Sequence, residues 1–552
     1  MHALVAASPT VAAGLAPEWR QRPLTRHRSS EPNEPNEPAD VVLVEIGDDG
    51  VPGWADLDAL TRTLTGLVGE DAAVVLWFTG DTSVGVVPTT MVEFAAAVYA
   101  IDEPTAASVT ERFDGVAVQV LGVAAQPRLY NPAVAGPGER RHLGACLVLD
   151  PTAPRAEDTT TLRELVSTAV QPLPREDLDL WRCAEAAVPP ADRLPGRLRK
   201  RLVGSVPATR LPALTSSYRV LLDAGRQSSA SAWSVVEAGA AQTAVVTTPE
   251  NAEAMPSGMA ELVPSAAEPK ALRSELVARL RQPELRDREG LLLHRAMLEQ
   301  HTYSHRVGQI LEAVGHPSPA PSRTVSAVVP TNRWHEIDNV LTNIGRQAHP
   351  DVELVLVLHG ITPDPVELRR RAVQAGLGSF EVVEADSALT LGACMNLGVE
   401  AASGAYIAKM DDDNFYGAHF LTDLLGAFEY TDAGIVGKWA HYVWLRDSNA
   451  VVLRNIAAEH TMERRIQGGS MLFEGDLVRA LRFGDLPRAV DSDILDRATA
   501  AGVGIYSGDR YNYVSIRNAD RHSHTWTVAD STFMTATGRL VFYGDPRPHV
   551  DV

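Results

Sequence analysis

Short apolar runs, each about as long as one β-strand, recur along this chain and alternate with segments of helical spacing. Val41–Ile46 and Ala73–Phe78 are almost entirely apolar, and residues 116–123 form a further β-branched stretch. Between the first two runs, Leu57–Val68 carries leucines that would share one face of a helix. Strands that are apolar on both faces are typical of a parallel sheet with helices on both sides. The pattern therefore predicts an α/β fold.

The length of the chain exceeds what one hydrophobic core usually serves, since 552 residues correspond to roughly three or four domains. Proline at every third position of residues 32–38 indicates an extended linker, and three prolines in residues 317–321 indicate another. We expect a flexible leader and linker at residues 1–40, a first Rossmann-like unit at residues 41–138, a second at residues 139–316 and a mixed α/β domain at residues 323–552.

In the second unit, the expected strands are Leu143–Leu149 and residues 218–222 and 244–246, and a long closing helix is expected at residues 287–312. The last domain opens with an expected strand at Val325–Thr331, followed by a helix at residues 334–347 and a second strand at residues 352–358. This β-loop-α-β order is typical of nucleotide-binding sheets, which hold ligands at the carboxyl ends of their strands.

Three consecutive carboxylates follow the apolar run Tyr406–Met410, namely Asp411, Asp412 and Asp413. Three like charges at one strand end are costly unless a counter-charge is present. Mn²⁺ or Mg²⁺ would remove that cost and would also bind a pyrophosphate group. A solvated acidic turn or a helix N-cap is the alternative interpretation.

The composition disfavours several classes of protein. The chain has 70 acidic and 50 basic residues and a net charge of −20, which would repel a nucleic acid. Its three cysteines are far apart and have no metal-ligand spacing, so neither a zinc site nor a disulfide framework is expected, as in a cytoplasmic protein. No apolar run is long enough to span a membrane. Peripheral membrane contact and homo-oligomer formation both stay open.

The acidic triplet and its surroundings resemble the family 2 glycosyltransferases, which have the GT-A fold. The matching segments are residues 328–331, Leu391–Gly398 and residues 402–413, in the order of that family. The resemblance implies that Asp411 lies near the ribose of a nucleotide sugar and that Asp413 ligates the metal that bridges its diphosphate. The residues that we expect to bind the donor are Pro330, Thr331, Asp386, Lys409, Asp411 and Asp412; Lys409 would touch phosphate or merely neutralise the triplet.

Two later segments also resemble that family. Residues 467–473 look like its acceptor-side strand, so Gly468 and Gly469 are expected to contact the acceptor. Asp491 resembles the family's catalytic base, which takes the proton of the acceptor hydroxyl; Asp493 is the runner-up, and helix capping is the alternative.

The segment at residues 521–526 resembles the C-terminal contact of the family, which implies that His524 is a further metal ligand and that Trp526 contacts the acceptor. The chain departs from the family after its second strand, where His359 stands in place of the acidic residue that reads the base. Asp386 is a candidate for the base pocket, and a UDP-sugar is the default donor by family prevalence.

Residues 41–316 are similar to GT-B glycosyltransferases of the group 1 or spore-maturation-protein type. The similarity lies in residues 234–240 and 301–306, and it implies that Glu237 binds a donor ribose. No glycine-rich phosphate loop follows Val41–Ile46, so a catalytically silent platform that positions the acceptor or mediates self-association is the alternative.

The resemblances together imply an inverting, metal-dependent transfer of a sugar from a nucleoside-diphosphate sugar to a glycan or another hydroxyl acceptor. A non-catalytic sugar- or polymer-binding scaffold with a decayed transferase domain is the first alternative, because of His359. A nucleotidyltransferase is the second, although the last domain lacks a glycine-rich, basic phosphate loop.

Overall fold

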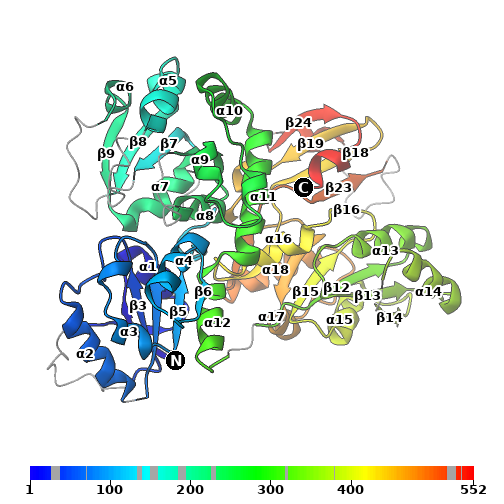
Figure 1. Cartoon of the computed structure of the whole chain (residues 1–552). Coiled ribbons are helices and arrows are strands. Elements are labelled where there is room, and N and C mark those ends of the chain that lie inside the picture. The colour runs from blue at the N-terminus through cyan, green and yellow to red at the C-terminus, as the bar shows by residue number, and fades with distance from the viewer. Residues whose placement is uncertain are drawn as a thin grey trace. The chain divides into compact units, whose positions relative to one another are not determined.

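The computed structural model divides the chain near residue 319 into two compact units (Figure 1). It describes residues 1–25, 38–69, 71–133, 140–149, 160–183, 194–224, 232–317, 321–377, 380–518, 530–535 and 537–552. The N-terminal unit has two parallel sheets and the C-terminal unit has mixed ones, which confirms the predicted α/β class. Within these residues, no helix combines the length and the apolar character that a membrane span requires.

The first sheet of the N-terminal unit has six parallel strands in the order β2-β1-β3-β4-β5-β6. β3 and β4 occupy its centre and are buried almost throughout, as their continuous apolar sequences predicted. The strands are β1 (His2–Ala6), β2 (Arg20–Pro23), β3 (Val41–Ile46), β4 (Ala73–Phe78), β5 (Ala97–Ala100) and β6 (Val118–Val120), and the helices are α1 (Pro9–Leu15), α2 (Leu57–Val68), α3 (Thr89–Glu93) and α4 (Glu103–Arg112).

Residues 2–23 belong to this sheet, so the expectation of a flexible leader is wrong for them. β1 pairs with β3 in parallel register from Ala3 with Val41 to Ala6 with Val44. Pro9 stands in the first turn of α1, where the missing N–H costs nothing. Most of the proline repeat lies in residues 26–37, outside the described residues.

The second sheet has five parallel strands in the order β11-β10-β7-β8-β9. Its strands are β7 (Leu143–Leu149), β8 (Leu178–Cys183), β9 (Leu202–Val206), β10 (Tyr218–Asp223) and β11 (Ala244–Thr247). The α-helices of this part are α5 (Ser167–Val170), α6 (Gly196–Arg199), α7 (Leu211–Ser217), α8 (Trp233–Ala240), α9 (Pro249–Ala252), α10 (Pro269–Arg281) and α11 (Pro283–Gln300). β8 and β9 were not predicted from the sequence, because polar, charged or glycine residues interrupt their apolar pattern.

The long helix expected at residues 287–312 is two helices, α11 and α12 (Tyr303–Ala313). Thr302 stands between them, accepts the backbone N–H of His305 as an N-cap and bridges to Ala125. Tyr303 and its neighbours on α12 are buried with Val5 and Val41 in the core of the first sheet. The end of the predicted second unit therefore completes the hydrophobic core of the first.

The main sheet of the C-terminal unit has eight strands in the order β14-β13-β12-β15-β21-β17-β22-β20. β14, β13, β12 and β15 run parallel, and β21 is antiparallel to β15, so the carboxyl ends of the first four strands meet the start of β21 at one edge. The strands are β12 (Val325–Thr331), β13 (Val352–His359), β14 (Phe380–Ala385), β15 (Tyr406–Met410), β17 (Ala433–Gly437), β20 (Thr461–Met462), β21 (Ser470–Glu474) and β22 (Gly504–Ser507).

The α-helices of this unit are α13 (Ile337–Gly345), α14 (Pro365–Gln374), α15 (Leu391–Ala401), α16 (Phe420–Ala427), α17 (Gly475–Leu481), α18 (Val490–Ala500) and α19 (Arg547–Val550). A further sheet, in the order β16-β23-β18-β19-β24, is mostly antiparallel. Its strands are β16 (Phe415–Tyr416), β18 (His441–Leu445), β19 (Ala450–Arg454), β23 (Tyr513–Arg517) and β24 (Gly538–Tyr543).

A buried histidine at the start of β18 makes the stability of this unit depend on pH. His441 is 1% exposed, and its Nδ1 lies 2.8 Å from the carbonyl oxygen of Trp439. Burial lowers the pKa of His441 to about 4. Because the folded state resists protonation of this ring, its contribution to stability is complete above the ordinary pKa of 6.5 and is lost as the pH falls toward 4.

We therefore expect the C-terminal unit to lose about 3 kcal/mol of stability between pH 7 and pH 4 through this histidine. His441→Gln, which cannot titrate, should flatten that part of the pH profile. Hydrogen exchange of β18 at a series of pH values measures the effect. Identical pH profiles for the two proteins would contradict this role of His441.

Candidate active site

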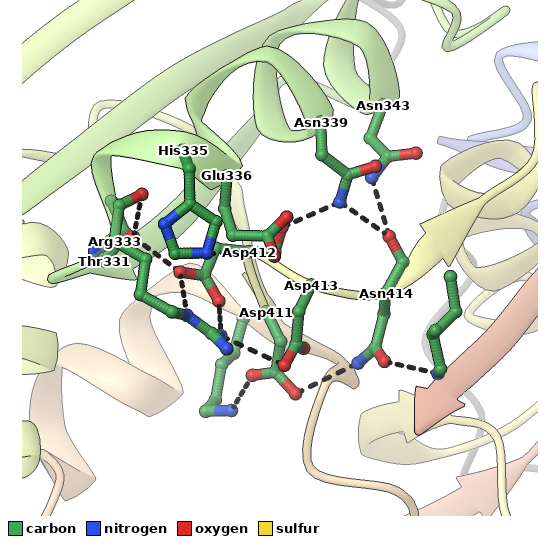
Figure 2. Close-up of polar contacts among 12 residues, drawn as sticks. Thr331, Arg333, His335, Glu336, Asn339, Asn343, Asp411, Asp412, Asp413 and Asn414 are labelled. Carbon is green, nitrogen blue, oxygen red and sulfur yellow. Dashed lines mark hydrogen bonds and ion pairs between the residues drawn. The ribbon is translucent and has the colours of Figure 1, made fainter. Parts of the chain in front are cut away.

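Strand register brings the acidic triplet to the edge where β12, β15 and β21 meet. β12 pairs in parallel with β15, with Val328 opposite Lys409, so Thr331 and Asp412 come side by side just beyond. β21 pairs antiparallel, with Ser470 opposite Met410, which brings the preceding glycines beside Asp411. Figure 2 shows the three aspartates and the residues of β12 and α13 around them.

Asp412 is the buried member of the triplet, at 4% exposure, and it points toward the loop after β12 (Figure 2). Its carboxylate accepts hydrogen bonds from the Thr331 hydroxyl and from the Arg333 guanidinium, whose Nε lies 3.1 Å away. Its carbonyl oxygen accepts the Asn339 side-chain amide at 2.7 Å. Asp412 thus fixes the loop and helix that follow the first strand.

Arg333 is a site residue that the sequence analysis missed. Its Nη2 contacts Asp412 and lies 3.0 Å from Asp413 Oδ2, so one guanidinium joins two carboxylates. Burial opposes its charge, but hydrogen bonds and attraction from the two aspartates outweigh burial and raise the pKa of Arg333. Its signal in the sequence is its position, two residues after Thr331 at the end of the first strand of this domain.

Lys409 lies under the triplet and joins it to Asp491. Its side chain is 3% exposed, and Nζ lies 2.8 Å from Asp411 Oδ1, 3.2 Å from Asp491 Oδ1 and 3.0 Å from the Gly468 carbonyl oxygen. The contacts with Asp411 and Gly468 are hydrogen bonds, and the contact with Asp491 is an ion pair. Burial disfavours its charge, yet the two carboxylates outweigh burial and raise the pKa of Lys409.

Negative charge exceeds positive charge at this edge. Burial raises the pKa of Asp411; Lys409 counteracts this, whereas Asp491 and Asp413 raise it further. The triplet and Asp491 together share two cations, Lys409 and Arg333. Within the described side chains of this cluster, a divalent cation would restore the balance.

The two glycines before β21 allow the carboxylates to pack against the backbone. A Cβ atom on Gly468 would overlap the Asp491 carboxylate, and one on Gly469 would overlap that of Asp411. The Tyr416 hydroxyl donates to the Gly469 carbonyl oxygen at 2.6 Å and accepts the backbone N–H of Asp411 at 2.7 Å. We expected Gly468 and Gly469 to contact the acceptor. In the structure their missing side chains leave the space that the Asp491 and Asp411 carboxylates fill.

Asp491 lies in the first turn of α18, and its side chain is 38% exposed. The N-cap of α18 is Ala489 in the left-handed region, with no side-chain capping hydrogen bond, so the capping interpretation of Asp491 has no support. Asp493, the runner-up, instead forms an ion pair with Arg497 at 2.7 Å. Of the two, Asp491 is the carboxylate that shares Lys409 with the triplet.

The described residues do not include any group of three or more His, Cys, Asp or Glu side chains arranged to hold a metal. Asp412 is bound to Arg333 and Thr331. The other two carboxylates of the triplet, Asp411 and Asp413, pair with Lys409 and Arg333, and the Asp413 side chain is 13% exposed. Mg²⁺ commonly binds one or two carboxylates and completes its shell with substrate phosphates and water, which these two residues fit. His524 and Trp526 lie outside the described residues.

Asp386, the candidate for the base pocket, and His359, which stands where the family has an acidic residue, lie farther along the same edge. His359 ends β13, and its Nε2 has no hydrogen-bond partner among the described residues. Asp386 follows β14, is exposed and accepts the backbone N–H of Ala388 at 2.8 Å. Because β13 and β12 separate β14 from β15, Asp386 is about 14 Å from the triplet, as counted in strand spacings. That span would suit a nucleoside lying across the strand ends.

Two family models match the chain. Residues 326–487 match the family described as "Glycosyl transferase family 2", and residues 170–312 match "Glycosyl transferase-like". Both resemblances inferred from the sequence are thereby confirmed, and residues 326–487 form a glycosyltransferase family 2 domain. No curated protein matches the chain.

Among solved structures, TarS 1–349 of S. aureus in complex with UDP-GlcNAc is 16% identical, with a TM-score of 0.32; the match covers 38% of this chain and 63% of that one. The mannosyltransferase PcManGT from Pyrobaculum calidifontis, in complex with GDP-Man and Mn²⁺, is 21% identical, with a TM-score of 0.28; the match covers 36% of this chain and 60% of that one. This chain thus spans less than two thirds of either structure.

Lys409→Met tests the buried ammonium. It should destabilise the C-terminal unit by about 3 kcal/mol, because two partly buried carboxylates lose their shared cation. The double variant Lys409→Met/Asp411→Asn should recover part of that loss, since it removes one of the uncompensated charges. Urea unfolding followed by hydrogen exchange of β15 measures both. Equal stability of Lys409→Met and the wild type would refute the pairing.

Proposed function

We propose that the C-terminal unit transfers a sugar from a nucleoside-diphosphate sugar, by default a UDP-sugar, to a hydroxyl group of a glycan or another acceptor. The reaction inverts the anomeric carbon and uses Mn²⁺ or Mg²⁺. One observation carries the proposal: Asp411, Asp413 and Asp491 meet at the carboxyl edge of a sheet within a family 2 domain. In open α/β sheets this edge is where ligands bind.

Asp491 acts as the general base in this proposal. It is partly exposed, and its carboxylate lies 3.2 Å from the ammonium of Lys409. Its carboxylate takes the proton of the acceptor hydroxyl while that oxygen forms a bond to the anomeric carbon. The bond from the anomeric carbon to the diphosphate oxygen breaks on the opposite face, and its electron pair leaves with the nucleoside diphosphate. A single displacement of this kind inverts the configuration.

Asp411 and Asp413 would hold the cation, which when bound neutralises the charge of the departing diphosphate. Arg333 keeps Asp412 and Asp413 oriented from the other side. Lys409 acts as a positioning residue, because it fixes the distance between the donor-side carboxylate of Asp411 and the base Asp491. Pro330 and Thr331 shape the strand end beside them, and His359 and Asp386 are assigned to the nucleoside.

The N-terminal unit is proposed to be an α/β platform that positions the acceptor or mediates self-association. Its Glu237 lies buried on α8, in the segment that matches the second family model. We assign the protein to the cytoplasm, in keeping with the free, buried thiols of Cys146 and Cys394.

Asp491→Asn should lower kcat/KM for sugar transfer on the order of 10³-fold while leaving donor affinity intact, because the amide cannot accept the proton. Asp493→Asn is the matched control: it lies on the same turn but pairs with Arg497, so transfer should persist. Product analysis by mass spectrometry gives the rates. Equal loss in both variants would remove Asp491 from the role of base.

Asp413→Ala should abolish the thermal stabilisation that a UDP-sugar gives in the presence of Mn²⁺, because the cation and the diphosphate bind together. The fold should persist, since Asp412 keeps its bonds to Arg333 and Thr331. Thermal shift with Mn²⁺ alone, UDP-glucose or UDP-GlcNAc alone, and each pair measures the effect. Undiminished transfer by Asp413→Ala in excess chelator would contradict the metal site.

The same assays separate the alternatives. A non-catalytic scaffold, the alternative based on His359 in place of the family's acidic residue, would bind sugars without metal-dependent turnover of the nucleotide sugar. A nucleotidyltransferase would release pyrophosphate, whereas glycosyl transfer releases a nucleoside diphosphate.

A further inference from the structure

The hydroxyl group of Tyr416 lies between two segments of the candidate active site. Tyr416 ends the short strand β16, which follows the acidic triplet, and its side chain is fully buried. The hydroxyl accepts the backbone N–H of Asp411 at 2.7 Å and donates to the backbone carbonyl oxygen of Gly469 at 2.6 Å. One oxygen atom therefore joins the end of β15 to the loop that precedes β21.

The register of the sheet indicates that this hydroxyl takes the place of a backbone hydrogen bond. β15 and β21 pair antiparallel, and their register makes Asp411 and Gly469 opposite residues just beyond the last pair. At the other end of the ladder, the N–H of Gly475 donates directly to the carbonyl oxygen of Ala405 at 2.7 Å. Hydrogen-bonded pairs alternate in an antiparallel ladder, and steps of two residues from Ala405 reach Asp411. The Tyr416 hydroxyl is thus inserted where Asp411 and Gly469 would otherwise bond directly.

This insertion separates the two strands where the carboxylates gather. A direct bond would hold the backbone nitrogen of Asp411 about 2.9 Å from the carbonyl oxygen of Gly469. Each of these atoms is instead bonded to the phenol oxygen between them. The Asp411 carboxylate packs against Gly469, and the Asp491 carboxylate packs against Gly468. The space that these carboxylates fill therefore depends on the separation of the strands.

The Tyr416 ring is held by residues outside the two strands that it separates. Its backbone N–H donates to the Asn343 side-chain oxygen at 3.2 Å. The ring packs against Phe420 and Tyr513, with centroids 4.9 Å and 5.4 Å away. Tyr513 is also its strand partner on β23. Because backbone and ring are both anchored, the second sheet and α13 fix the position of the hydroxyl.

Lys409 joins the same two segments a second time. Its Nζ donates to the Asp411 carboxylate and to the Gly468 carbonyl oxygen, whereas Tyr416 binds the backbone of Asp411. We propose that Tyr416 is a positioning residue of the sugar transfer, which sets the separation between the donor-side carboxylate of Asp411 and the base Asp491. The inference rests on the proposed function, whose geometry it explains.

Tyr416→Phe removes only the phenol oxygen. We expect the strands to close, so that crystal structures of the variant and the wild type show the Asp411 nitrogen moving to about 2.9 Å from the Gly469 carbonyl oxygen. The kcat for release of UDP from UDP-glucose or UDP-GlcNAc with Mn²⁺ should fall on the order of 10²-fold, as for a misplaced catalytic group. The dissociation constant of UDP with Mn²⁺, measured by isothermal titration, should change less than about threefold, because the loss concerns the transition state.

Tyr506→Phe is the matched control. Tyr506 is also fully buried in this unit, and its hydroxyl lies 3.3 Å from Nδ1 of His460. Its strand β22 is three strand spacings, about 14 Å, from β15. Tyr506→Phe loses the same atom from the same unit, so it should keep the wild-type kcat.

Three results would overturn the positioning role: an unchanged separation of the Asp411 nitrogen and the Gly469 carbonyl oxygen in Tyr416→Phe, equal losses of kcat in the two variants, or a loss of UDP affinity as large as that of kcat. Each of them leaves the transferase proposal standing if the wild type turns over a UDP-sugar. A wild type that neither binds UDP with Mn²⁺ nor releases it from a UDP-sugar contradicts the transferase proposal itself, and the positioning role falls with it.

Discussion

The ammonium of Lys409 lies between the two acidic groups that the proposed chemistry requires. Asp411 follows β15 and Asp491 begins α18, and in the folded unit both carboxylates contact the same Nζ atom. Without the Lys409 ammonium the two carboxylates would repel each other, and burial would strengthen that repulsion. Lys409 also donates a hydrogen bond to the backbone carbonyl of Gly468, so it fixes the loop that precedes β21. Its hydrogen bond to Asp411 and its ion pair with Asp491 hold the two acidic groups of the proposed chemistry at one ammonium.

Arg333 has a corresponding role on the other side of the triplet. It contacts both Asp412 and Asp413, whereas Asp411 contacts Lys409. The three consecutive aspartates thus do not all share one cation. Asp412 is held by Arg333 and Thr331, Asp411 pairs with Lys409, and Asp413 shares Arg333 with Asp412. Among the side chains that the structure describes, two cations face the triplet and Asp491, an arrangement that suits a divalent ion and the diphosphate that such an ion binds.

The N-terminal unit contains residues 170–312, the segment that matches the second family model. Its two parallel sheets are joined by α12, which follows the second sheet in sequence and fills the core of the first. The first unit expected from sequence lacks a glycine-rich phosphate loop after β3, where the structure has a tight turn at Gly47 and Gly50 instead. A positioning or assembly role agrees with that turn better than a second donor site does.

The sequence by itself determined the elements whose signal is local. Buried strands such as β3, β4, β12 and β15 are mostly apolar runs, which the sequence pattern locates. The triplet was recognisable because carboxylates directly after such a strand are rare without a counter-charge. Asp491 was chosen over Asp493 only through a resemblance. β1, by contrast, was read as part of a leader, because a short apolar segment near Pro9 does not reveal its partner strand.

Only the tertiary structure decided which charges share a partner. Arg333 lies in the loop after β12, Lys409 in β15 and Asp491 in α18. Strand register brings Arg333 and Lys409 within hydrogen-bond distance of the triplet, and Asp491 comes within 3.2 Å of Lys409. The break between α11 and α12 likewise depends on Thr302 meeting Ala125, a contact between distant segments. Apolar periodicity encodes where a strand forms, because that depends on neighbouring residues; strand order and side-chain pairing depend on the packing of the whole unit.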